Sequence, residues 1–187
     1  MTDQELKDLV ASLAVSQKET DRLQKETDRQ LKELKTQVKQ TNKQLGELGN
    51  RLGGYTEGLL APGLIHILYT KFKMDTVGPR VRSRRKDLEL DILGYTNGGT
   101  NTAYIVEIKS RADDDAVEQL LDTLAAFPQA FPEHAGKKIY AILAAVDVPP
   151  NIQNRLAKLG IYLAVTSNDV VKLVTPAKFV PQNYGAA

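Results

Sequence analysis

Two acidic residues and one lysine of this 187-residue chain are candidates for a reactive or cation-binding site: Asp91, Glu107 and Lys109. Asp91 lies in an alternating apolar run at residues 88–93, and the other two lie in a second such run at 104–109. Alternation at period 2 with β-branched and aromatic residues predicts two half-buried strands. Turn-forming residues between the two runs predict that the strands form a hairpin.

The loop of this hairpin decides whether the two carboxylates meet. If it is centred on Gly99, Asp91 lies directly opposite Glu107 on the same face, with Cβ atoms roughly 4.5–5.5 Å apart. The lysine two positions later then points to the same side, about 7 Å along the strand. Two carboxylates this close repel each other, and a divalent cation together with the ammonium is the simplest source of compensating charge. A two-residue turn at 97–98 would instead place Asp91 opposite Tyr104.

The order Asp, hairpin, Glu-x-Lys resembles the active-site core of the PD-(D/E)XK nuclease superfamily. The matching residues are Asp91, Glu107 and Lys109, while Leu90 stands where the family has Pro. The resemblance implies that the two carboxylates and the Ile108 carbonyl bind Mg²⁺ or Mn²⁺ through hard oxygen ligands. It also implies that the cation activates a water and polarises a phosphodiester, and that the lysine orients this water or stabilises the transition state.

Two further residues match positions at which some members of the superfamily carry site groups. Glu57 resembles a glutamate of the first core helix that reaches the metal, although it could equally be an acid favoured by a helix N-terminus. Gln119 resembles an active-site glutamine on the helix after the lysine, but Thr123 stands where the family has Tyr. The aspartates at 113–115 open this helix, and we interpret them as capping residues, not metal ligands.

Composition and charge limit the class of protein. The chain has no Cys, which excludes a disulfide framework and a thiolate metal site. Its acidic, polar N-terminus is unlike a secretory signal, and no apolar run approaches the length of a membrane span. We therefore expect a cytoplasmic protein without a membrane association. The net charge of +2 is too small to indicate nucleic acid by itself.

A basic cluster precedes the strand that carries Asp91. It consists of Arg80, Arg82, Arg84, Arg85 and Lys86. Such clusters are most often solvated surface. Beside a phosphodiester site, this one would form a phosphate-binding edge, which makes nucleic acid the expected partner. DNA is the expected kind, but nothing in these residues separates DNA from RNA.

Residues 1–49 carry a seven-residue repeat. Its d positions are Leu6, Leu13, Thr20, Thr27, Leu34, Thr41 and Leu48, and its a positions are Val10, Gln17, Gln24, Leu31, Val38 and Leu45. This strict heptad predicts a left-handed coiled coil through which the chain self-associates. Its polar middle would weaken the pairing. The alternative is a solvated or disordered tail, and the strand number and orientation stay open.

Glycines at 46, 49, 53 and 54 are predicted to loosen the chain and mark a boundary. The expected parts are a coiled-coil helix at 1–49, a nuclease-like domain at 50–175 and a tail at 176–187. Pro62 is predicted to interrupt or kink the helix after the boundary, and His66 is predicted to pack in the core.

From about residue 54, the expected order of elements is α-β-β-β-α-β-α-β, an α/β sandwich with a mixed sheet. This order matches the restriction-endonuclease-like core of the superfamily over residues 51–174. Preceded by heptads, it also resembles a group of uncharacterised prokaryotic members. The function predicted from the resemblance is a metal-dependent nuclease. The alternatives are a catalytically silent fold used as an oligomeric scaffold for nucleic acid or protein, and an ordinary ion pair between Glu107 and Lys109.

Overall fold

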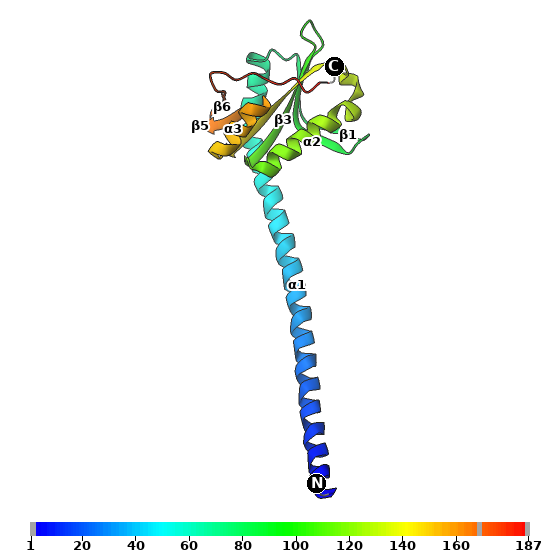
Figure 1. Cartoon of the computed structure of the whole chain (residues 1–187). Coiled ribbons are helices and arrows are strands. Elements are labelled where there is room, and N and C mark those ends of the chain that lie inside the picture. The colour runs from blue at the N-terminus through cyan, green and yellow to red at the C-terminus, as the bar shows by residue number, and fades with distance from the viewer. Residues whose placement is uncertain (1–2, 168–169, 186–187) are drawn as a thin grey trace. The chain divides into compact units, whose positions relative to one another are not determined.

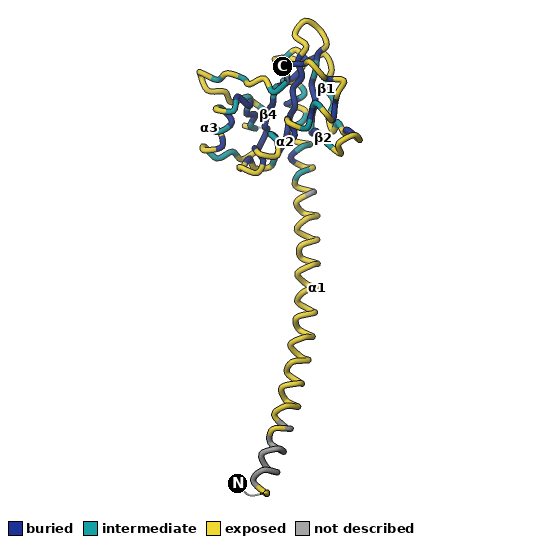
Figure 2. Tube along the Cα trace, turned by 45° about the vertical axis from the view of Figure 1, so that its right-hand side comes forward, coloured by how far each residue is buried: buried dark blue, intermediate teal, exposed yellow. Residues whose placement is uncertain are grey.

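The structure is a computed structural model that describes residues 3–167 and 170–185. Contacts divide the chain into two compact units, Met1–Asn50 and Arg51–Ala187. The helix α1 spans Asp3–Thr70 and contributes to both units. Within the first unit, every residue from Ser16 to Gly49 is exposed (Figure 2). No helix among the described residues is both long and apolar enough to cross a membrane.

The second unit is a mixed α/β fold (Figure 1). After α1 its elements are β1 (Thr76–Ser83), β2 (Leu88–Thr96), β3 (Thr102–Arg111), α2 (Asp114–Ala130), the short 3₁₀ helix η1 (Pro132–His134), β4 (Lys138–Asp147), α3 (Pro150–Leu159), β5 (Tyr162–Ser167) and β6 (Val170–Val174). The six strands form one sheet in the order of the chain. The β3–β4 and β4–β5 pairs are parallel and the other pairs are antiparallel, so the expected mixed sheet is confirmed.

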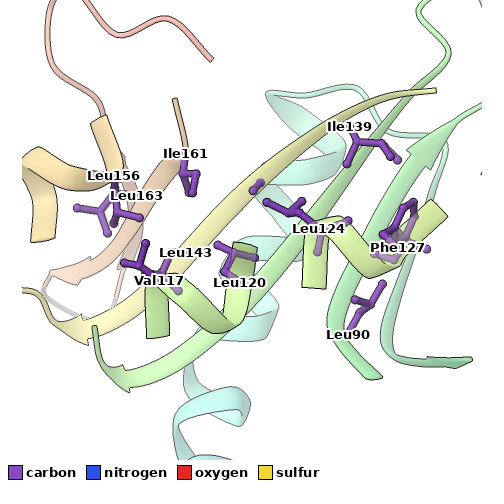
Figure 3. Close-up of a cluster of buried hydrophobic side chains, with 14 of the residues drawn as sticks. Leu90, Val117, Leu120, Leu124, Phe127, Ile139, Leu143, Leu156, Ile161 and Leu163 are labelled. Carbon is purple, nitrogen blue, oxygen red and sulfur yellow. The ribbon is translucent and has the colours of Figure 1, made fainter. Parts of the chain in front are cut away.

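Two apolar clusters cover the two faces of this sheet. On one face, α2 and α3 pack through residues such as Leu120, Phe127 and Leu156 against strand residues that include Leu143 (Figure 3). On the other face, Leu60, Leu64 and Leu68 of α1 form the second cluster. Because both faces of β4 are covered, its near-continuous apolar sequence is that of a buried central strand.

Local signals set the ends of the two helices that follow the hairpin. The Asp113 carboxylate accepts a hydrogen bond from the Ala116 backbone N–H at the start of α2, so the capping interpretation is confirmed for Asp113. Pro150 opens α3, where a missing N–H costs nothing. Gly160 ends it in the left-handed conformation with φ 66°, which glycine adopts without strain.

The hairpin register is the one that a loop centred on Gly99 predicts. Ile92 pairs with Val106 and Thr96 pairs with Thr102, so the short turn at 97–98 is excluded. The paired residues end at Ile92 and Val106, so Asp91 and Glu107 are the next residue on each strand.

Two predictions about α1 were wrong. The helix continues through the glycines at 46–54 and through Pro62. Each glycine costs only about 1 kcal/mol, and the burial of Leu60 and Leu64 on either side of the proline offsets its lost hydrogen bond. His66 is exposed, because the buried positions of this helix follow a spacing of four residues that includes Leu64 and Leu68 but not His66.

Candidate active site

In the paired strands β1 and β2, the regular alternation of side chains between the two faces of the sheet is interrupted at Arg80 and Asp91. Leu90 packs under α2, whereas Ile92 packs under α1. Residues two apart in a regular strand point to the same face, so the strand must be irregular between them. The regular alternation that was predicted for residues 88–93 is therefore wrong at Asp91.

β1 is irregular at the same level. Val77 packs under α1 and Val81 packs under α2. The register pairs Pro79 with Ile92 and Val81 with Leu90, and it leaves out the position between them, where Arg80 has a left-handed φ of 50°. Non-glycine residues in this conformation are uncommon and cluster at functional sites.

Asp91 lies at this irregularity and lines a cavity of about 150 Å³. Its Oδ2 accepts a hydrogen bond of 2.7 Å from the Ile108 backbone N–H. The pKa of Asp91 is raised to about 6, by burial first and then by the charges of Glu107 and Glu57, against the opposing effects of the Ile108 hydrogen bond and Lys109. Asp91 is therefore a carboxylate with too little positive charge around it.

Glu107 and Lys109 form an ion pair on the neighbouring strand. The Lys109 Nζ lies 2.7 Å from Glu107 Oε1 and donates a 2.9 Å hydrogen bond to Gln119 Oε1 of α2. Glu107 is buried, so the lysine compensates a charge that would otherwise be costly inside the protein. Gln119 therefore contacts Lys109 in the structure.

Glu57 lines the same cavity as Asp91 and is held by Arg80. The Arg80 guanidinium donates from Nε at 3.1 Å and from Nη2 at 2.9 Å to Glu57 Oε2. This pair was not predicted, because the two residues are 23 positions apart in the sequence. Arg80 was instead predicted to belong to a phosphate-binding cluster. The adjacent Pro79, which cannot donate a ladder hydrogen bond, was the available signal that the strand is irregular here.

The basic cluster is therefore divided in the structure. Arg80 pairs with Glu57, and Arg82 pairs with Asp87. The other three basic residues are exposed in the turn between β1 and β2, and within the described chain they form no ion pair: Arg84, Arg85 and Lys86. Strand β2 begins directly after this turn at Leu88, three residues or about 10 Å before Asp91.

The donors at the cavity are of the kind that Mg²⁺ or Mn²⁺ takes. Asp91, Glu57 and the Ile108 backbone offer hard oxygen ligands, and Asp91 Oδ1 accepts no hydrogen bond from any described residue. Their present arrangement is not a closed metal cage: no three His, Cys, Asp or Glu side chains of the described residues are grouped to hold an ion. Glu57 and Glu107 instead each contact a basic residue of their own chain.

No family model matches the chain, and no curated protein matches it. Among solved structures, it is similar to a repair endonuclease from Pyrococcus abyssi, with 19% identity and a TM-score of 0.37, over 55% of this chain and 45% of that one. It is also similar to EndoMS in a complex with double-stranded DNA, with 18% identity and a TM-score of 0.38, over 57% and 44% of the two chains.

A third similar structure is the SPO1766 protein of unknown function from Silicibacter pomeroyi, with 14% identity and a TM-score of 0.37, over 65% of this chain and 73% of that one. The aligned part spans less than half the length of the two endonucleases. At identities and TM-scores this low, the likeness carries no argument about the activity of this chain.

Proposed function

We propose that this protein is a metal-dependent nuclease that hydrolyses phosphodiester bonds of nucleic acid, with DNA as the expected substrate. The observation that supports the proposal is the 2.7 Å hydrogen bond from the Ile108 N–H to Asp91 Oδ2, which joins Asp91 to the strand of Glu107 and Lys109 beside a cavity that Glu57 also lines. Asp91, Glu107, Glu57 and the Ile108 carbonyl would hold Mg²⁺ or Mn²⁺, which supplies a bound water of lowered pKa.

Lys109 is the group that would stabilise charge on the phosphate. Gln119 and Glu107 both hold its ammonium, so its position does not depend on a flexible surface side chain. A fixed donor of this kind stabilises developing charge at little reorganisation cost. The exposed basic turn at 84–86 would contact the nucleic-acid backbone. Self-association through residues 1–49 belongs to the same proposal.

A second candidate function is supported by one observation. Glu57 and Glu107 are already neutralised by Arg80 and Lys109, so the chain balances most of its own site charge without a cation. This would suit a catalytically silent fold that binds nucleic acid or protein as an oligomeric scaffold.

Cleavage assays separate the two functions. Mixed DNA and RNA substrates would be incubated with Mg²⁺ or Mn²⁺ and wild type, Asp91→Asn or Lys109→Met. Matched controls are Asp122→Asn and Lys138→Met, which alter exposed residues of α2 and β4.

The nuclease proposal predicts metal-dependent cleavage that both site variants lose and both controls keep. Absence of cleavage by the folded wild type, with Mn²⁺ binding also absent in calorimetry, would contradict it. Retained binding of nucleic acid in that case would favour the scaffold.

A further inference from the structure

The part of α1 that belongs to the second unit has two different faces. Thr56, Leu60, Leu64 and Leu68 are buried against the sheet. On the adjacent side of the helix, Leu52, Tyr55 and Leu59 are 53%, 71% and 42% exposed. Three large apolar side chains within eight residues of one helix form a surface that nothing in the second unit covers.

The spacing of this surface continues the heptad of the first unit. Counting in sevens from the a positions Leu31, Val38 and Leu45 gives Leu52 and Leu59, and counting from the d position Leu48 gives Tyr55. Between residues 31 and 59, the exposed large hydrophobic residues of α1 all fall at a or d: Leu31, Leu34, Val38, Leu45, Leu48, Leu52, Tyr55 and Leu59. The next a and d positions, Pro62 and His66, are less apolar, so the surface ends at Leu59.

The charges of the helix lie away from this line of residues. The ion pairs described within the first unit join residues at positions c and f, on the side opposite a and d: Glu19–Arg22, Glu26–Arg29, Arg29–Glu33 and Lys43–Glu47. Most flanking e and g positions from 30 to 58 are uncharged, among them Gln37, Asn42 and Gln44. A neutral, apolar seam with charges on the outer side fits a helix of the same repeat.

We propose that Leu52, Tyr55 and Leu59 form a docking surface for the same residues of a second copy of this chain, parallel and in register. A second copy of the chain carries the same heptad repeat over the same length. It can therefore cover the a and d residues along the whole helix. The polar layers at 17, 20, 24 and 27 are confined to the N-terminal half of the seam. In a full-length antiparallel pair, these polar residues would face apolar residues of the partner helix. In a parallel pair, polar residues face polar residues and apolar residues face apolar ones.

This surface goes beyond the self-association expected for residues 1–49, because it includes the second unit in the interface. It also leaves the candidate site open. Glu57 is at an f position, on the opposite side of the helix from a and d, and it contacts Arg80. The inference does not rest on nuclease activity, since pairing and cleavage are measured independently.

The absence of Cys makes a cross-linking test direct. Single-cysteine variants of the full chain, Leu52→Cys, Tyr55→Cys and Leu59→Cys, would be oxidised and analysed on non-reducing gels. The control is Gly54→Cys at an exposed c position of the same helix, where an added Cβ meets nothing within 4 Å. The proposal predicts disulfide-linked dimers in at least fivefold excess at 52, 55 and 59 over position 54.

Three outcomes would overturn the proposal. Equal cross-linking at 54 would mean random collision, and no cross-linking at 52–59 while Leu45→Cys reacts would mean a parallel seam that ends in the first unit. The third test compares the double variant Leu52→Glu/Leu59→Glu with the control Val180→Glu, which changes another exposed apolar residue. The proposal predicts that light scattering shows at least tenfold weaker self-association of the double variant. No difference between these variants would contradict a docking role for this surface.

Discussion

Arg80 and Asp91 occupy facing positions of β1 and β2 at the level where the register between the two strands is interrupted. Arg80 adopts a left-handed φ there, and its guanidinium binds Glu57. Asp91 keeps one hydrogen bond, from the Ile108 N–H, and a pKa raised to about 6. Arg80, with its strained backbone, and Asp91, whose negative charge is poorly compensated, therefore line the same cavity. Both features lower the stability of the folded protein at neutral pH.

Replacement of Asp91 by Asn should stabilise the protein at pH 7. Asn keeps an oxygen that can accept from Ile108 N–H but removes the charge that burial and Glu107 disfavour. We expect a gain of about 1–2 kcal/mol in the free energy of unfolding, because Asp91 is only half-buried and solvent screens part of the effect. Urea unfolding at pH 7 measures this gain.

The pH dependence of that difference has a definite sign. The pKa of Asp91 is higher in the folded protein than in the unfolded chain, so the folded state binds more protons between about pH 4 and pH 6. Relative to Asp91→Asn, the wild type should lose stability as the pH rises through this window. A difference that stays constant from pH 4 to pH 7 would show that the charge of Asp91 costs nothing.

Lys109→Met should destabilise the fold by about 1–3 kcal/mol, because it leaves the buried Glu107 carboxylate without its cation. The double variant Glu107→Gln/Lys109→Met should recover most of that loss, since the uncompensated charge is gone. Thermal unfolding of the two single variants and the double variant forms a complete cycle. Additive effects would mean that the 2.7 Å pair contributes no coupling.

Arg80→Gln should strengthen Mn²⁺ binding severalfold in calorimetry. The change frees Glu57 from its guanidinium partner, so the carboxylate no longer has to exchange one cation for another. Arg82→Gln is the control, because that arginine pairs with Asp87 outside the cavity. Unchanged or weaker binding in Arg80→Gln would remove Glu57 from the set of proposed ligands.

Alanine substitution of the exposed turn should weaken nucleic-acid binding and its salt dependence. Removing Arg84, Arg85 and Lys86 together would reduce the slope of log affinity against log salt by up to about 3 for duplex DNA, because each phosphate contact contributes about 0.9. The control removes three exposed lysines of the first unit at b positions: Lys25, Lys32 and Lys39. Equal effects of both triple variants would indicate a general charge effect without a binding turn.

Local rules were enough to predict much of the fold. The turn-forming residues between β2 and β3 predicted a hairpin, although they left two registers open, and the aspartates at 113–115 predicted the start of α2. Each of these depends on the conformational preference of a few neighbouring residues.

The geometry of the site depended on contacts that no local pattern contains. The phase change at Arg80 and Asp91 requires two strands to be irregular together, and period-2 counting along either strand cannot show it. Lys137 was also missed: its buried ammonium donates to the Thr96 carbonyl and to the side chains of Asn97 and Asn101, which ties the hairpin loop to the start of β4. A lysine in a polar stretch carries no sequence signal of burial.

The most direct test of the account is to locate Mn²⁺ by its anomalous scattering in crystals of the wild type and of Asp91→Asn grown with the ion. We predict a peak within ligand distance of Asp91 in the wild type and no peak at that place in the variant. Wild-type crystals without a peak at Asp91, at Mn²⁺ concentrations that support cleavage by other nucleases, would contradict a cation site at this hairpin and with it the proposed metal-dependent activity.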